Sequence, residues 1–220
     1  MGRAPGSDQI TFAALRRDPS SAERFPQDIL ELQGYLSGQS RVEGVQATPG
    51  AGTNIPLYIL GSSLFGAQLA GILGLPYAFA SHFAPAALKQ AVALYRSSFK
   101  ASAQLKQPHV IAGVNVFAAE TEAEALAQRQ IVQRARVSLL LGRGRTFSDE
   151  EADSILRGPQ GRFLVEMMHY SATGTPSKVK EYLINFAKHA DADELIIAFA
   201  APTLVGRLYA VAQVAEQMRS

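Results

Sequence analysis

The chain has 220 residues, of which 47% are hydrophobic and 18% are charged, and this balance fits one globular domain over residues 1–220 with a sizeable core. A formal charge of +2 and scattered Lys and Arg residues give no polyanion-binding signature, so we expect no nucleic-acid partner. The absence of cysteine excludes disulfides, thiolate metal sites and cysteine nucleophiles, and it fits a cytoplasmic protein.

The N-terminal part of the chain is predicted to be polar and rich in loops. Residues 1–9 (MGRAPGSDQ) are rich in turn formers and lack the apolar core of a signal peptide. Apolar residues recur at helical spacing between 21 and 37, which predicts a helix there. Residues 38–54 have the Gly, Pro, Ser and Thr content of a surface excursion.

An uncharged stretch follows at residues 56–80, PLYILGSSLFGAQLAGILGLPYAFA. A run of about 20 apolar residues has the length of a transmembrane helix, so a membrane span is one interpretation. The glycines, serines and proline within the stretch favour a series of shorter elements, in which Ser63 caps a helix and Gly74 ends it. We therefore expect no membrane partner. These elements are a strand at 55–60, a helix at 64–73 and a strand at 77–80.

Strands and helices continue to alternate toward the C-terminus. The predicted elements are a helix at 85–99, a strand at 110–118, a helix at 120–144 capped by Thr121, irregular or helical structure at 145–172, a helix at 177–189, a strand at 194–200 and a helix at 203–218. A strand buried on both faces is a continuous apolar run, as VIAGVNVFA is. The alternation predicts an α/β fold with parallel strands.

Three motifs resemble the bacterial luciferase-like monooxygenase family. They are GRAPGSDQ near the N-terminus, IPLYILGSSLFGAQLAGILGLPYAFASHF in the middle and GTPSKVKEYLINFAKHADADELII near the C-terminus. The resemblance runs over nearly the whole chain and implies the C-terminal portion of a (β/α)8 TIM barrel, about strands 4 or 5 to 8 with flanking helices. Residues 55–118 would then hold core strands five to seven, and residues 173–200 the last βα unit.

The resemblance also implies a flavin cofactor, reduced FMN. In the family the turn after the fifth strand and the next helix hold the flavin phosphate, and the matching residues are Ser62, Ser63, Leu64 and Gly66. The physical chemistry agrees, because a small-residue turn that opens a helix aims N–H groups and the positive end of the helix dipole at an anion. Arg3 matches an arginine near the phosphate in relatives, where it would be a bidentate clamp. From sequence alone, a plain strand–helix turn with a cap is the alternative.

The activity that the resemblance implies is oxygenation of a small organic substrate by reduced FMN and O2. The catalytic residues are unknown, since in such enzymes the cofactor carries the oxygen chemistry. His82, after the sixth strand, is expected on the substrate side of the flavin, and a histidine packed in an apolar wall is the alternative. No metal-ligand spacing is visible. Reduced flavin would come from a separate flavin reductase or from bound NAD(P)H.

Relative to the family, the chain is expected to lack strands one to three and most of strand four, because a full barrel needs about 250 residues. An open half-barrel would expose edge strands. This predicts either marginal stability, self-association into a homo-oligomer, or an upstream start site that this sequence omits. The same feature favours an alternative function, that of a catalytically inactive truncated remnant acting as a binding or self-associating module. A deazaflavin in place of FMN is a third possibility, because the phosphate turn does not distinguish the two cofactors.

Overall fold

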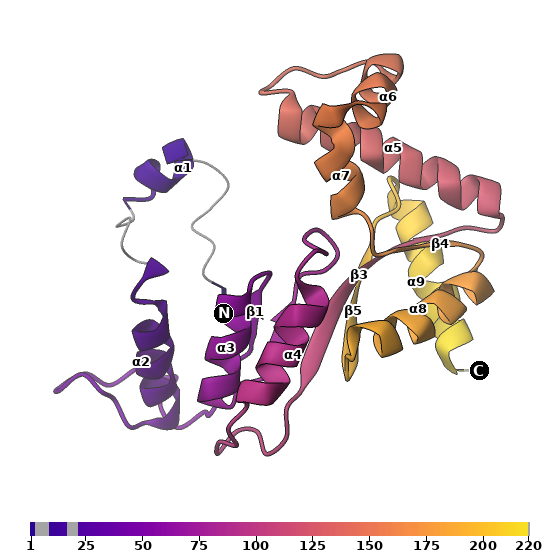
Figure 1. Ribbon diagram of the computed structural model, residues 1–220. Coiled ribbons are helices and arrows are strands. Elements are labelled where there is room, and N and C mark those ends of the chain that lie inside the picture. The colour runs from indigo at the N-terminus through magenta and orange to yellow at the C-terminus, as the bar shows by residue number, and fades with distance from the viewer. Residues whose placement is uncertain (3–8, 17–21, 220) are drawn as a thin grey trace. The chain divides into compact units, whose positions relative to one another are not determined.

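The uncharged stretch folds into a strand, a helix and a second strand. The computed structural model describes residues 1–2, 9–16 and 22–219 (Figure 1). In it β1 spans Ile59–Gly61, α3 spans Leu64–Leu73 and β2 spans Tyr77–Phe79. Gly74 ends α3 as predicted, at a φ of 63° that glycine adopts without strain. Among the described residues, no helix is long and apolar enough to cross a membrane.

β1 is shorter than the strand predicted at 55–60. The Leu57 N–H donates to Gln104 Oε1 at 3.0 Å, and the Leu57 carbonyl accepts from Gln104 Nε2 at 2.8 Å. The Gln104 side chain therefore makes the hydrogen bonds to the Leu57 backbone that a neighbouring strand would otherwise make. Ile55 and Tyr58 are exposed, so this part of the apolar run is not a buried strand.

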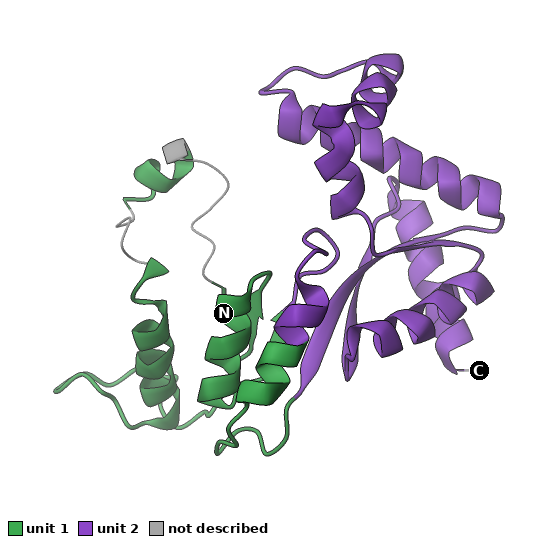
Figure 2. Ribbon diagram, in the orientation of Figure 1, with its two compact units in different colours: residues 1–78, 93–108 green, residues 79–92, 109–220 purple. Residues whose placement is uncertain are grey.

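The chain divides into two compact units (Figure 2). Unit 1 comprises Met1–Ala78 and Ala93–Pro108, and unit 2 comprises Phe79–Val92 and His109–Ser220. The division passes through β2 and through α4 (Leu88–Ser98), which lies within the helix predicted at 85–99. The single domain over 1–220 stays a prediction.

Unit 1 contains the N-terminal helices and the β1–α3 pair. Helix α1 spans Gln9–Ala14, and α2 spans Phe25–Ser37 within the helix predicted at 21–37. Residues 38–54 form neither helix nor strand, as their composition predicts. The exposed, irregular segment therefore separates α2 from β1 along the chain.

The core of unit 1 forms where α3 packs near the C-terminal half of α4. The rings of Tyr77 and Tyr95 lie 5.5 Å apart, and Tyr95 Oη donates to the Leu75 carbonyl at 3.0 Å. A Cβ added to Gly71 would lie 2.4 Å from Ser98 Oγ. The missing side chain at Gly71 therefore lets the two helices approach closely.

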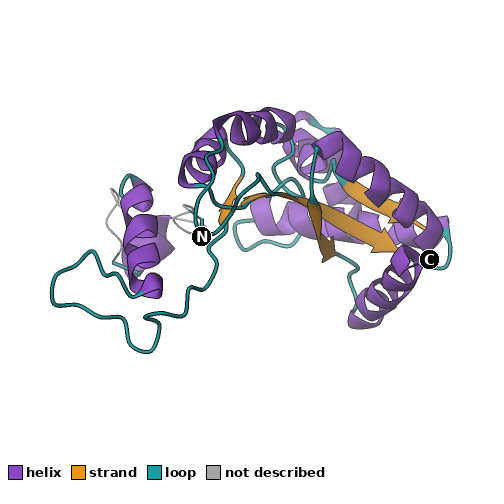
Figure 3. Ribbon diagram, turned by 90° about the horizontal axis from the view of Figure 1, so that it is seen from below, coloured by secondary structure: helices purple, strands orange, loops and turns teal. Residues whose placement is uncertain are grey.

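β3 is the central strand of unit 2. It spans Val110–Ala118, as predicted, and all nine of its residues are buried. β3 pairs in parallel with β4 (Ser171–Gly174) and with β5 (Glu194–Phe199). Figure 3 draws these strands in orange beside the helices of the unit. The predicted α/β fold with parallel strands is confirmed.

Capping side chains set the starts of two helices in unit 2. Thr121 caps α5 as predicted and forms a capping box with Glu124, and Ser148 and Glu151 form a second one at α6. The other helices and β5 lie close to their predicted bounds. The prediction of irregular, helical or loop structure at 171–174 is wrong, because these residues pair with β3 and form β4. The helices of this part are α5 (Glu122–Leu141), α6 (Asp149–Arg157), the short 3₁₀ helix η2 (Pro159–Gly161), α7 (Arg162–Met167), α8 (Pro176–Ala190) and α9 (Leu204–Arg219).

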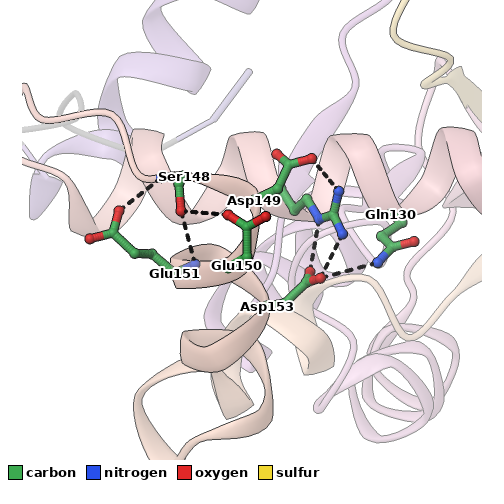
Figure 4. Close-up of polar contacts among 7 residues, drawn as sticks. Gln130, Ser148, Asp149, Glu150, Glu151 and Asp153 are labelled. Atoms are coloured by element: carbon green, nitrogen blue, oxygen red, sulfur yellow. Dashed lines mark hydrogen bonds and ion pairs between the residues drawn. The ribbon is translucent and has the colours of Figure 1, made fainter.

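An ion-pair network ties α5 to α6 (Figure 4). Arg134 on α5 donates to both Asp149 and Asp153 on α6, and its Nε lies 2.8 Å from Asp153 Oδ1. Gln130 adds a longer contact of 3.4 Å to Asp153. The Arg134 hydrogen bond lowers the pKa of Asp153, so this carboxylate is ionised at neutral pH.

Candidate functional site

The turn after β1 carries two serines whose hydroxyls point to no partner in the described part of the chain. Ser62 and Ser63 connect β1 to α3, and both are exposed. Ser63 occupies the N-cap position with φ −140° and ψ 164°, but its side chain makes no capping hydrogen bond. The predicted position of the cap is therefore right, and the predicted use of its hydroxyl is wrong.

Tyr77 on β2 holds this turn in place within unit 1. Its Oη donates to the Ser63 carbonyl at 3.1 Å, and its ring packs against Gly61 and Gly66. Tyr77 is fully buried, and burial raises its pKa well above the ordinary value. The phenol therefore stays protonated and keeps donating at neutral pH.

The geometry of the turn suits an anion. The first N–H groups of a helix have no acceptor within the helix, and here no serine side chain accepts from them. Leu64 and Gly66 lie in this first turn, so their backbone and the serine hydroxyls supply donors at one end of α3. The predicted residues Ser62, Ser63, Leu64 and Gly66 are thus brought together.

The predicted arginine clamp lies outside the described residues, since Arg3 falls in the range 3–8. The two residues before it are described and pair with β1. Gly2 forms a parallel bridge with Leu60, and the Met1 amino group donates to the Tyr58 carbonyl at 2.7 Å. The start of the chain therefore runs parallel to β1.

His82 lies in a turn of unit 2 just after β2. Its main-chain carbonyl accepts from Asn115 Nδ2 at 2.6 Å, and the preceding Ser81 Oγ donates to the Gly113 carbonyl at 2.6 Å. The His82 ring is half-buried; burial first, and then the charge of Arg136, lowers its pKa. The imidazole is therefore neutral at pH 7, and its contact with substrate stays a prediction.

Two residues of β3 that sequence reasoning missed determine where His82 lies. A Cβ added to Gly113 would lie 2.4 Å from His82 Nδ1, so the ring rests directly against this glycine. Asn115 is 1% exposed and uses its amide to hold the His82 carbonyl. The sequence did contain a signal, because Asn115 is the one hydrogen-bonding side chain in the apolar run VIAGVNVFA.

Within residues 1–2, 9–16 and 22–219, no group of three or more His, Asp or Glu side chains could hold a metal ion. A different polar feature lies near the end of β4, where the buried Thr173 Oγ1 has no hydrogen-bond partner in the described part of the chain. Thr173 is register-paired with Phe117, two residues after Asn115 on β3.

Comparison with known sequences identifies the family. The family model described as luciferase-like monooxygenase matches residues 30–220. A luciferase-like monooxygenase of Escherichia coli (strain K12) is 39% identical over 200 residues, which cover 90% of this chain. The chain spans about 60% of the length of the curated relatives it matches.

Solved structures agree with the sequence match. The crystal structure of apo-MsnO8 is 28% identical and superposes with a TM-score of 0.82, covering 99% of this chain and 67% of that one. A coenzyme F420-dependent tetrahydromethanopterin reductase from Methanopyrus kandleri, 18% identical, has a TM-score of 0.64 over 99% of this chain and 72% of its own, which shows the fold alone. The predicted C-terminal portion of a luciferase-like (β/α)8 barrel is thereby confirmed.

Proposed function

The chain belongs to the luciferase-like monooxygenase family, and we propose that it acts as a flavin-dependent monooxygenase on a small organic substrate. The observation that carries the proposal is the turn after β1. Its exposed serine hydroxyls and the N–H groups of Leu64 and Gly66 at the start of α3 form a donor set, and the Ser63 side chain accepts from none of them. Such a set fits the phosphate of FMN.

In this proposal the residues of unit 1 bind the cofactor's phosphate. Ser62 and Ser63 donate from their hydroxyls, and Leu64 and Gly66 contribute backbone N–H groups from the first turn of α3. Tyr77 keeps the turn in position through its bond to the Ser63 carbonyl. Arg3 is proposed as a further phosphate ligand on the strength of the family motif alone.

Bound reduced FMN would supply two electrons, so that one atom of O2 enters the substrate and the other leaves as water. The chain's contribution is then binding, orientation and exclusion of water. His82 is proposed on the substrate side, where its neutral ring has hydrogen-bonding nitrogens to offer. Reduced flavin is proposed to come from a flavin reductase or from NAD(P)H, and the protein is proposed to be a homo-oligomer.

The proposal is tested by comparing FMN with riboflavin, which lacks the phosphate. Both flavins should be titrated into the whole chain, once in the reduced form without oxygen and once in the oxidised form. Flavin fluorescence reports binding of the oxidised form. We expect FMN to bind more tightly than riboflavin. Replacing both serines by alanine should weaken FMN roughly tenfold or more, because each hydrogen bond to a charged group contributes about 1.5–3 kcal/mol. Riboflavin affinity should not change.

Ser154→Ala on α6 is the matched control, because Ser154 is an exposed serine far along the chain from the turn. Equal affinities for FMN and riboflavin, unaffected by the double substitution, would contradict the phosphate site. Failure of any flavin to bind would favour the alternative function, a noncatalytic binding or self-associating module.

A deazaflavin is the second candidate cofactor. The solved structure of a coenzyme F420-dependent reductase shares this fold, and the phosphate turn does not distinguish a deazaflavin from FMN. Titration with coenzyme F420 beside FMN, in the same wild-type protein, separates the two cofactors. If coenzyme F420 bound more tightly than FMN and supported hydride transfer without oxygen uptake, the proposed activity would change from monooxygenase to reductase.

A further inference from the structure

Helix α5 carries two arginines in very different surroundings. Arg134 is neutralised by Asp149 and Asp153. Arg136, two residues later, is half-buried, and its Nη1 is inaccessible to solvent and has no hydrogen-bond partner among the described residues. Burial lowers the pKa of Arg136. Withdrawing an N–H group of a guanidinium from water without a partner is unfavourable, so this atom needs an explanation.

The surroundings of Arg136 point to the His82 turn. The charge of Arg136 acts on His82, where it lowers the pKa in addition to burial. α5 packs against β3 and β4 in unit 2, and β3 is the strand on which the His82 ring rests through Gly113. Neither ring nitrogen of His82 is hydrogen-bonded to a described residue. Arg136 Nη1 and the ring nitrogens of His82 therefore both have unused hydrogen-bonding capacity within the described part of the chain.

Protonating His82 would add a second positive charge to that of Arg136 and would be unfavourable, whereas a carboxylate would neutralise the guanidinium. Arg136 raises the cost of protonating His82, so the pair by itself is electrostatically unfavourable. An anionic group between them would neutralise the guanidinium and accept its planar pair of N–H donors. A neutral ligand would leave the charge of Arg136 uncompensated.

We propose that Arg136 is an anion-binding residue beside His82 and that it receives a carboxylate, sulfonate or phosphate group of the ligand. The inference rests on the proposed function only for the identity of that ligand. The anion is the acidic group of an organic substrate, because the proposed function already places the cofactor's phosphate at the turn after β1.

The test follows the four histidine rings of the whole chain by ¹H–¹³C NMR, with His82→Gln assigning the His82 signal. The probes are hexanesulfonate and hexanoate, neutral hexanol, FMN and riboflavin, each added alone. We expect the two organic anions to shift the His82 signal saturably, and hexanol to bind at least about tenfold more weakly. A response to FMN without a response to riboflavin or hexanesulfonate would overturn the assignment of this site to an acidic substrate.

Substitutions at Arg136 give the second half of the test. Arg136→Gln should weaken the responding anion about tenfold or more, and Arg136→Lys should retain part of the affinity because it keeps the charge. Arg207→Gln, an exposed arginine on α9, is the matched control and should change nothing. Arg136→Gln should also raise the pKa of His82, which reports their proximity without any ligand.

Stability separates binding from a structural role. Removing an unpaired buried charge should leave resistance to urea unchanged or increase it, whereas a structural arginine would lower it. The inference is overturned if no anion binds in an Arg136-dependent way, or if hexanol binds as tightly as hexanesulfonate. The organic-anion measurements contain no flavin, so a failure of FMN to bind at Ser62 and Ser63 would leave this result standing.

Discussion

The side-chain amide of Asn115 donates a 2.6 Å hydrogen bond to the main-chain carbonyl of His82, 33 residues earlier in the chain. Asn115 lies at the centre of β3 and is almost fully buried. The bond therefore joins the turn after β2 to the central strand of unit 2. Ser81, with its own bond to the Gly113 carbonyl, makes the same connection one residue earlier.

Asn115→Ala should destabilise the fold. The His82 carbonyl would lose its donor in a poorly solvated place, and we expect the free energy of unfolding to fall by about 1–3 kcal/mol. Urea denaturation followed by circular dichroism measures this loss. Asn185→Ala on the exposed side of α8 is the control and should stay within about 0.5 kcal/mol of wild type. Equal effects of the two substitutions would refute the role given to Asn115.

Gly113→Ala should displace the His82 ring. The new Cβ would lie 2.4 Å from His82 Nδ1, a distance that forces the ring to move. We expect a loss of about 1–3 kcal/mol from overpacking and a changed chemical shift for the His82 ring. Gly158→Ala provides the comparison, because its Cβ would meet its nearest neighbours at an ordinary 3.4 Å. An unchanged His82 spectrum in Gly113→Ala would show that the ring does not rest on this strand.

Gly74→Ala should cost more than Gly52→Ala, although both glycines have positive φ angles, 63° and 81°. Both substitutions place alanine in the left-handed region at a cost of roughly 1–2 kcal/mol. At Gly74 the Cβ would also lie 2.3 Å from the Lys100 carbonyl oxygen, whereas at Gly52 it meets nothing within 4 Å. Differential scanning calorimetry should thus give the lower Tm for Gly74→Ala. Matching Tm values would mean that packing around the end of α3 is not tight.

The α5–α6 ion pairs should make stability depend on acid pH. Hydrogen bonding from Arg134 lowers the pKa of Asp153 below 3.8, so the folded pKa is lower than the unfolded one. The stabilisation is therefore present above pH 3.8 and is lost as the pH falls toward the folded pKa. Asp153→Asn and Arg134→Gln should each flatten the fall in unfolding free energy over that range.

Acid titration of the urea midpoint measures this dependence. Glu216→Gln on α9 serves as control, because Glu216 is exposed and forms no ion pair with another described residue. If Asp153→Asn keeps the full acid sensitivity of the wild type, the network drawn in Figure 4 does not contribute to stability.

Local sequence patterns predicted most of the secondary structure. The bounds of α3 and β3, the Thr121 cap and the Gly74 stop all depend on residues within a few positions of one another, so periodicity and capping rules apply to them directly. The Ser148–Glu151 capping box was present in the sequence in the same form and would have located the start of α6.

Contacts between distant segments could not be predicted in this way. Residues 55–58 are apolar enough for a strand, but Gln104 makes hydrogen bonds to the backbone of Leu57, and nothing near Leu57 in the sequence indicates this. The sequence did indicate the turn after β1, because its residues Ser62, Ser63, Leu64 and Gly66 are nearly contiguous. The residues that position His82, Gly113 and Asn115, lie on β3, far from His82 in the sequence.

Neighbouring residues, acting through backbone conformation and helix periodicity, were enough to specify where most elements begin and end and to mark the family. Which polar groups meet depended on the pairing of strands and the packing of helices, since these bring residues together regardless of their separation. That is why Arg134 pairs with two carboxylates and Arg136 with none of those in the described residues, although the two arginines are of the same residue type and lie on the same helix.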